Sequence, residues 1–381
     1  MDRTADAGLL PQGLRDILPP DAAFEAAVVE RLLAAFAARG YDRVKPPLLE
    51  FEDGFLRSAG ADVARQTFRL MDPVSHRMLA LRSDITPQVA RIAATRFRRA
   101  PRPLRLSYAG QVLQVSGSQL RPERQFGQAG VELIGAATPM AEAETVLLAV
   151  EALGELGLRD LAIDLNLPTL VAVAARALGL ADAAIARLRS ALDRKDEAAV
   201  APIAGAHAPL FLSLLRAFGP AEEALSRLHA MPLPDPARAE LADLAEAVTV
   251  VRRQAPGLAL TLDPVEHRGF EYQSGISFVF FAPAARGELG RGGRYRTEAG
   301  ESATGFTLFT DTLLRALPAP APARRLLVGR ELPAADAARL RKEGWVTVLA
   351  LSDARDLREE ARRLGCSHVW TGDGARPVDS K

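Results

Sequence analysis

The stretch from Arg98 to Gly135, RRAPRPLRLSYAGQVLQVSGSQLRPERQFGQAGVELIG, constrains the fold most. Two β-type runs flank a single loop that carries Arg121 and Arg124. Consecutive strands joined in this way predict a β-hairpin, and therefore antiparallel pairing. The layout suits a hairpin that grips a nucleotide.

Helical and β-type segments alternate around this hairpin. Apolar spacing predicts a helix over residues 21–40, with Asp21 as its N-cap and Gly40 as its stop. A second helix opens near Pro87 with Thr86 as a cap, and a third covers about 138–156 and ends at Gly157. We expect a core of residues 1–165 and 255–318, a helical insertion over 166–254, and a linker with a small α/β module over 319–381.

Composition excludes several classes of protein. The net charge of +1 argues against a generally basic nucleic-acid binder. The single cysteine, Cys366, rules out an internal disulfide, and the five histidines show no metal-ligand spacing, so we expect no metal. Neither a P-loop nor a Rossmann glycine pattern is present, and we expect no cofactor. We also expect no membrane-spanning helix, which would need about 18 or more apolar residues, and a cytoplasmic location.

Six ordered segments over roughly residues 8–318 resemble histidyl-tRNA synthetase, a class II aminoacyl-tRNA synthetase. The 21–50 segment resembles the dimer-forming motif 1, and LSYAGQVLQV…RQFGQAGVELIG resembles motif 2. LRSDITPQVARI, EHRGFEYQSGISFVFF and GGRY resemble the segments that contact the amino acid, and GFTLFTDTLL resembles motif 3. The resemblance implies an α+β fold, with an antiparallel sheet flanked by helices.

Departures from the family pattern fall on its ATP contacts. The motif 2 arginine that meets the α-phosphate aligns with Gln114, and the acidic residue after it aligns with Ser116. The motif 3 arginine aligns with Thr312. A neutral amide or a hydroxyl cannot replace a bidentate guanidinium on phosphate, so we expect no ATP-dependent activation of an amino acid and no catalytic residues. Arg121 and Arg124 remain alternative sources of the missing charge.

The amino-acid pocket, in contrast, matches the family at most positions. Gln128 and Glu132 are four apart on one strand, so their side chains face the same side. Asp84 and Glu132 suit an ammonium group or an imidazole N–H, whereas an arginine suits a carboxylate. One family tyrosine is replaced by Gln273. The resemblance implies six histidine-binding residues: Asp84, Thr86, Gln128, Glu132, Arg268 and Tyr272.

A histidine pocket without an ATP clamp resembles a family of synthetase paralogues, the regulatory subunits of ATP phosphoribosyltransferase. That resemblance implies a homodimer within a hetero-octamer, a short-form catalytic subunit as partner, and histidine as the allosteric ligand. The chain would then be a non-catalytic subunit in the first step of histidine biosynthesis, needed for activity and for feedback inhibition. A divergent synthetase and an RNA-binding module that keeps the synthetase fold are the alternatives.

Simpler interpretations remain open for individual residues. Gln128 and Glu132 could be polar strand residues facing water, and Asp84 could serve the N-terminus of a helix. The arginine-rich run TRFRRAPRPLRLS suits a phosphate or nucleic-acid surface, a solvated face, or an acidic patch on a partner.

Overall fold

The computed structural model describes residues 8–58, 61–117, 121–266, 273–351 and 356–378. The chain divides into two compact units, Met1–Pro318 and Ala319–Lys381. Each unit has its own hydrophobic clusters, so each is described by itself.

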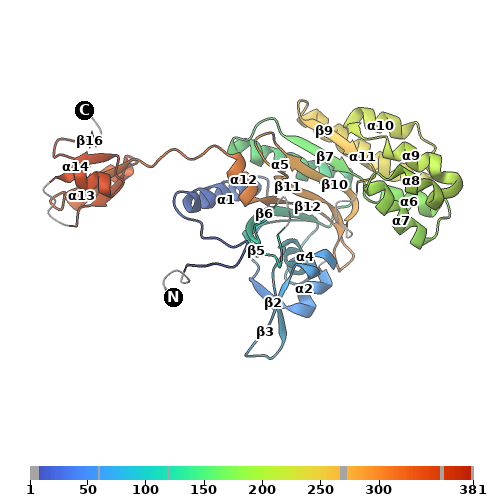
Figure 1. Ribbon diagram of the computed structural model, residues 1–381, viewed down its shortest axis with the longest axis horizontal. Helices are drawn as coiled ribbons and strands as arrows, with labels where there is room; N and C mark the ends of the chain where they lie inside the picture. The colour runs from blue at the N-terminus through green and yellow to red at the C-terminus, as the bar shows by residue number, and fades with distance from the viewer. Residues whose placement is uncertain (1–7, 59–60, 118–120, 267–272, 352–355, 379–381) are drawn as a thin grey trace. The chain divides into compact units, whose positions relative to one another are not determined.

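A nine-stranded mixed sheet organises the larger unit (Figure 1). The central strands pair antiparallel, whereas β1 runs parallel to β5 and β7 runs parallel to β9. In spatial order the strands are β1 (Asp42–Arg43), β5 (Leu104–Leu113), β6 (Gln125–Ile134), β12 (Ser302–Phe309), β11 (Gly290–Arg296), β10 (Gln273–Phe281), β7 (Ala162–Asn166), β9 (Ala259–Asp263) and β8 (Gly219–Pro220). The predicted hairpin is β5 and β6, and its strands pair over their whole length.

Helices cover the two faces of this sheet separately. Ala129, Val131 and Leu133 of β6 belong to the core cluster that includes α1 (Asp21–Ala38) and α5 (Pro139–Leu156). Alternate residues of the same strand face the other way, toward the cluster that includes α4 (Thr86–Thr95). Figure 1 shows α4 and α5 on opposite sides of the sheet. Gln128 and Glu132 therefore lie on the α4 face.

Two of the expected helix caps are wrong. Asp21 and Thr86 are the first helical residues, and the N-cap positions belong to Pro20 and Ile85. The Thr86 hydroxyl pairs with Tyr108 instead of bonding to its own helix. The stops are as expected: Gly40, after the C-cap residue Arg39 of α1, and Gly157, directly after α5, adopt positive φ angles of 82° and 105°.

The region between β7 and β9 is almost entirely helical. Apart from the two-residue strand β8, its elements are α6 (Leu170–Ala177), α7 (Asp182–Asp193), α8 (Glu197–Ala204), a 3₁₀ turn (Gly205–His207), α9 (Ala208–Leu215), α10 (Ala221–His229) and α11 (Asp235–Gln254). Helix α11 packs on α5, so this helical region is continuous with the main core.

One apolar segment bears on the expectation that no helix spans a membrane. Glu197–Leu215 is long and apolar enough to cross a membrane by length and composition. The structure breaks it into α8, the 3₁₀ turn and α9, and Phe211 and Leu214 are fully buried in the main core. The apolar character of this segment is therefore used in packing within the protein.

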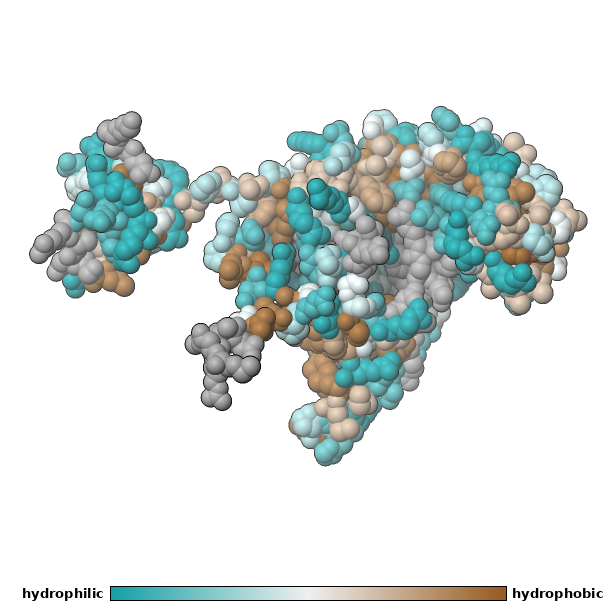
Figure 2. All heavy atoms as spheres, in the orientation of Figure 1, coloured by the Kyte–Doolittle hydropathy of each residue, from teal (hydrophilic) through white to brown (hydrophobic). Residues whose placement is uncertain are grey.

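A small three-stranded sheet projects from the larger unit. It consists of β2 (Leu49–Phe51), β4 (Met78–Leu81) and β3 (Phe68–Met71), with α2 (Glu52–Ser58) and α3 (Ala61–Arg65) between β2 and β3. Brown residues in Figure 2 fall on this part of the molecule. The exposed large apolar residues here are Leu48, Leu49, Phe51, Leu70, Met71, Val74 and Met78.

The smaller unit is an α/β module with a four-stranded sheet of order β14-β13-β15-β16. Its first three strands run parallel, and β16 is antiparallel at the edge. The elements are β13 (Arg325–Val328), α13 (Ala334–Lys342), β14 (Val346–Leu349), α14 (Leu357–Arg363), β15 (His368–Trp370) and β16 (Ala375–Pro377).

Candidate functional site: a buried carboxylate pocket and an ion-paired arginine cluster

The N-terminus of α4 and the middle of β6 build the candidate pocket. The Gln128 side chain accepts a hydrogen bond from the Ile85 backbone N–H at 3.0 Å. It also bonds the Asp84 carboxylate, which accepts from the backbone N–H groups of Ile85 and Thr86. Asp84 therefore serves the helix N-terminus, as one of the simpler interpretations expects, while it stands beside Gln128.

Glu132 is the most deeply buried of the predicted site residues that the structure describes, at 1% exposure. Its carboxylate accepts from the Tyr295 hydroxyl at 2.9 Å and from the hydroxyls of Thr86 and Tyr108. Burial raises the pKa of Glu132 to about 8, and the neighbouring charge of Asp84 adds to the rise. Burial also raises the pKa of Asp84 above its usual range. The two carboxyl groups therefore form an electrostatically coupled pair.

Close strand packing makes room for Glu132. Gly305 of β12 lies opposite it in the strand register. A Cβ at Gly305 would lie 2.2 Å from Glu132 Oε2 and 2.4 Å from the Val131 carbonyl oxygen. Only glycine fits at this position.

The structure thus brings together four of the six predicted residues: Asp84, Thr86, Gln128 and Glu132. Gln128 is 4% exposed, so the interpretation that it and Glu132 face water is wrong. The other two predicted residues, Arg268 and Tyr272, lie outside the described residues.

Sequence reasoning missed two tyrosines and a threonine of this site. Tyr108 donates to or accepts from Thr307 at 2.7 Å and Thr86 at 3.1 Å, and Tyr295 holds Glu132. The GGRY segment was a signal for Tyr295. No local pattern marked Tyr108, because its role depends on the pairing of β5, β6 and β12.

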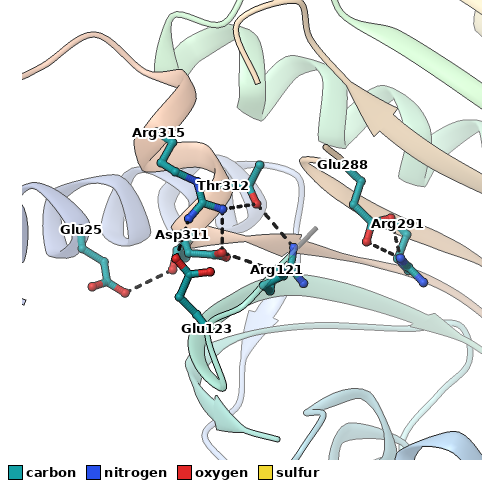
Figure 3. A network of polar contacts seen from close by, with 9 residues as sticks. Glu25, Arg121, Glu123, Glu288, Arg291, Asp311, Thr312 and Arg315 are labelled. Carbon is teal, nitrogen blue, oxygen red and sulfur yellow. Dashed lines mark hydrogen bonds and ion pairs between the residues drawn. The ribbon is translucent and has the colours of Figure 1, made fainter. Parts of the chain in front are cut away.

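A second polar cluster surrounds Asp311 and Thr312 (Figure 3). The Arg121 guanidinium lies 3.7 Å from the Phe309 ring centre and 4.6 Å from that of Phe126. Its Nε is 3.3 Å from Asp311 Oδ2, and Nη2 donates to Thr312 at 3.4 Å. Arg121 is thus stacked on aromatic rings and ion-paired.

Further ion pairs connect the charged side chains of this cluster. Arg315 donates to Asp311 at 3.0 Å and to Glu123 at 3.2 Å, and Arg291 pairs with Glu288. Figure 3 shows Arg121 pointing toward the Asp311 and Thr312 side of this group. Each guanidinium of Arg121, Arg315 and Arg291 therefore faces a carboxylate of the same chain.

The other loop arginine is also engaged within the chain. Arg124 donates to the carbonyl oxygens of Gln114 and Gln12, both at 3.2 Å, and lies over the Phe68 ring. Gln114 follows the last residue of β5, and its amide donates to the Ser83 carbonyl at 3.4 Å. The guanidinium groups of Arg121 and Arg124 are therefore both bonded within the chain and are not positioned to bind a phosphate.

Known proteins resemble this chain along nearly its whole length. The model of the histidyl-tRNA synthetase family matches residues 13–313. The ATP phosphoribosyltransferase regulatory subunit of Rhodospirillum centenum is 56% identical over 374 residues, covering 98% of this chain and 97% of that protein. The regulatory subunit of Paramagnetospirillum magneticum is 54% identical over 379 residues, and the alignment covers 100% of both proteins.

Solved structures agree on the fold. A Bacillus halodurans protein described as an ATP phosphoribosyltransferase regulatory subunit/histidyl-tRNA synthetase superposes with a TM-score of 0.82 at 24% identity, over 94% of this chain and 96% of that chain. Histidyl-tRNA synthetase from Nostoc gives a TM-score of 0.77 at 17% identity, over 95% of this chain and 90% of that chain. The α+β synthetase-like fold expected from the sequence is confirmed. The chain belongs to the histidyl-tRNA synthetase family and, within it, to the ATP phosphoribosyltransferase regulatory subunits.

Proposed function

We propose that this protein binds histidine in the pocket of Asp84, Thr86, Gln128 and Glu132 and regulates a short-form ATP phosphoribosyltransferase without catalysing a reaction itself. The carrying observation is the contrast between two neighbouring regions. The Glu132 carboxylate is buried in the amino-acid pocket. In contrast, the guanidinium of Arg121, which could have bound a phosphate, is ion-paired with Asp311.

The chemistry of the pocket suits an amino acid with two cationic or donor groups. An ammonium group beside Asp84 or Glu132 would favour the ionised form of the carboxylate. Because the pKa of Glu132 is about 8, a cation bound beside it near neutral pH would displace its proton. Arg268 and Tyr272 would complete the site from the segment before β10.

The proposed complex contains a homodimer of this chain bound to catalytic subunits. The dimer would form through the 21–50 region, as the resemblance implies. Exposed Leu48 and Leu49, at 56% and 38%, lie within that region and support a protein contact there. Histidine would inhibit by binding one state of the complex better than the other, with a coupling of about 1–3 kcal/mol.

Glu132→Ala tests the pocket. We expect the complex with the catalytic subunit to assemble but to lose inhibition by histidine, because the buried carboxylate that meets the ligand is gone. Phosphoribosyl transfer is measured with and without histidine, and assembly by sedimentation. Glu246→Ala, at an exposed position on α11, is the control and should remain inhibited. Full inhibition of the Glu132 variant would place the histidine site elsewhere.

The same purified chain distinguishes the alternatives. A divergent synthetase would catalyse histidine-dependent exchange of pyrophosphate into ATP, and we expect none. An RNA-binding module would shift tRNA in a gel at low salt, with strong salt dependence. Robust exchange, or a tight salt-dependent shift without any effect on phosphoribosyl transfer, would contradict the proposal.

A further inference from the structure

A charged turn outside the pocket follows α4. Arg96, Arg98 and Arg99 are exposed, and none of them forms an ion pair with any residue that the structure describes. Three exposed positive charges within four residues are notable in a chain whose net charge is only +1. Unpaired cations at one place mark a surface able to accept negative charge.

The turn is held in one conformation by Arg102. The guanidinium of Arg102 binds both oxygens of Glu301, at 2.6 and 3.0 Å, and donates to the carbonyl oxygens of Phe97 and Ala100 at 3.0 and 2.9 Å. Gly135 permits this packing, since a Cβ there would lie 2.7 Å from Arg102 Cδ. The backbone that carries Arg98 and Arg99 is therefore ordered in advance, which lowers the entropic cost of binding a partner.

Helix α4 connects this turn to the candidate pocket. Its N-terminus is bonded to Asp84 and Gln128, and its C-terminus leads into Arg96. Val89 and Ala93 are buried in the core between these ends, and ten helical residues span roughly 15 Å. One packed helix therefore carries the pocket at one end and the arginines at the other.

We propose that Arg96, Arg98 and Arg99 form a docking site for an acidic surface of the catalytic partner. This inference rests on the proposed function and names where the partner binds. A protein fits better than a nucleic acid, because three cations on one turn do not make a basic stripe. In addition, the ring of Phe97, which lies between Arg96 and Arg98 in the sequence, packs against the core and is not presented for stacking on a base.

Charge reversal in the full-length chain tests the docking site. For Arg98→Glu/Arg99→Glu, we expect the affinity for the short-form catalytic subunit to fall about tenfold or more, mainly through slower association. Binding of the unaltered chain should weaken as salt rises. Arg98→Lys/Arg99→Lys keeps the charge and should retain most of the affinity. Histidine binding to the free chain, measured by calorimetry, should stay within about twofold of wild type, since α4 remains packed.

A matched control uses two other exposed arginines. Arg187→Glu/Arg253→Glu makes the same change in net charge on the helical region and should leave the affinity for the catalytic subunit unchanged. Equal loss in both charge-reversed variants, or no loss in either, would overturn the docking site while leaving the proposed function intact. If wild type itself does not assemble, both proposals fail. Salt-dependent tRNA binding that disappears in the Arg98/Arg99 variant, with assembly unchanged, would assign the turn to nucleic acid and also overturn the docking site.

Discussion

At the residue scale, Glu132 is held in the fold at a cost that depends on pH. Its carboxyl group titrates near 4.5 in the unfolded chain and near 8 in the folded protein. The proton therefore binds the folded state more tightly. The destabilisation is absent below about pH 4.5, grows through pH 8, and is constant above it, with a limit of roughly 5 kcal/mol.

Glu132→Gln should remove this pH dependence. We expect the variant to have a higher Tm than wild type at pH 9 and a similar Tm at pH 5, because an amide keeps the shape without the charge. Thermal unfolding followed by circular dichroism at several pH values measures the difference. A difference in Tm that is the same at every pH would show that Glu132 titrates normally.

At the element scale, the register of β6 and β12 sets the pocket. Gly305→Ala would drive a methyl group into Glu132 Oε2 and the Val131 carbonyl oxygen, which are 2.2 and 2.4 Å from that Cβ position. We expect a loss of about 1–3 kcal/mol in the free energy of unfolding, as in other overpacked sites, and weaker histidine binding. Urea unfolding and calorimetry measure the two effects.

Gly154→Ala provides the comparison for that substitution. A Cβ at Gly154 of α5 meets nothing within 4 Å. Alanine is also the better helix former by about 1 kcal/mol. This variant should be at least as stable as wild type, and it should bind histidine normally. Similar destabilisation of both variants would remove the special role of the β6–β12 contact.

The elements that the sequence predicts well are those with long local patterns. β5, β6 and α5 have clear periodicity and glycine stops, so their extents follow from the chain itself. The cap at Thr86 could not be predicted correctly, because the Thr86 hydroxyl bonds to Tyr108 on a distant strand. Tyr295 reaches Glu132 only through the pairing of β11, β12 and β6, which no local pattern contains.

At the scale of the whole molecule, the two units have separate cores. Cys366 and Val369 are buried inside the smaller unit, and the candidate pocket belongs entirely to the larger one. A chain ending at Pro318 should therefore fold and bind histidine with the affinity of the full-length protein. Circular dichroism and calorimetry test this. Loss of histidine binding in the shortened chain would show that residues 319–381 contribute to the pocket.

The ion-paired cluster of Arg121, Asp311, Thr312 and Arg315 also bears on how readily a phosphate-binding site could be introduced into this chain. Thr312→Arg alone would add another guanidinium to a group in which Arg121 and Arg315 already share Asp311. Gln114→Arg alone would leave Arg121 stacked on Phe309. Each single substitution therefore either adds a like charge to the cluster or leaves Arg121 in place, and a phosphate site requires several changes together. A phosphate site is therefore out of reach of either substitution alone, because the contacts that hold Arg121 within the chain would have to change at the same time.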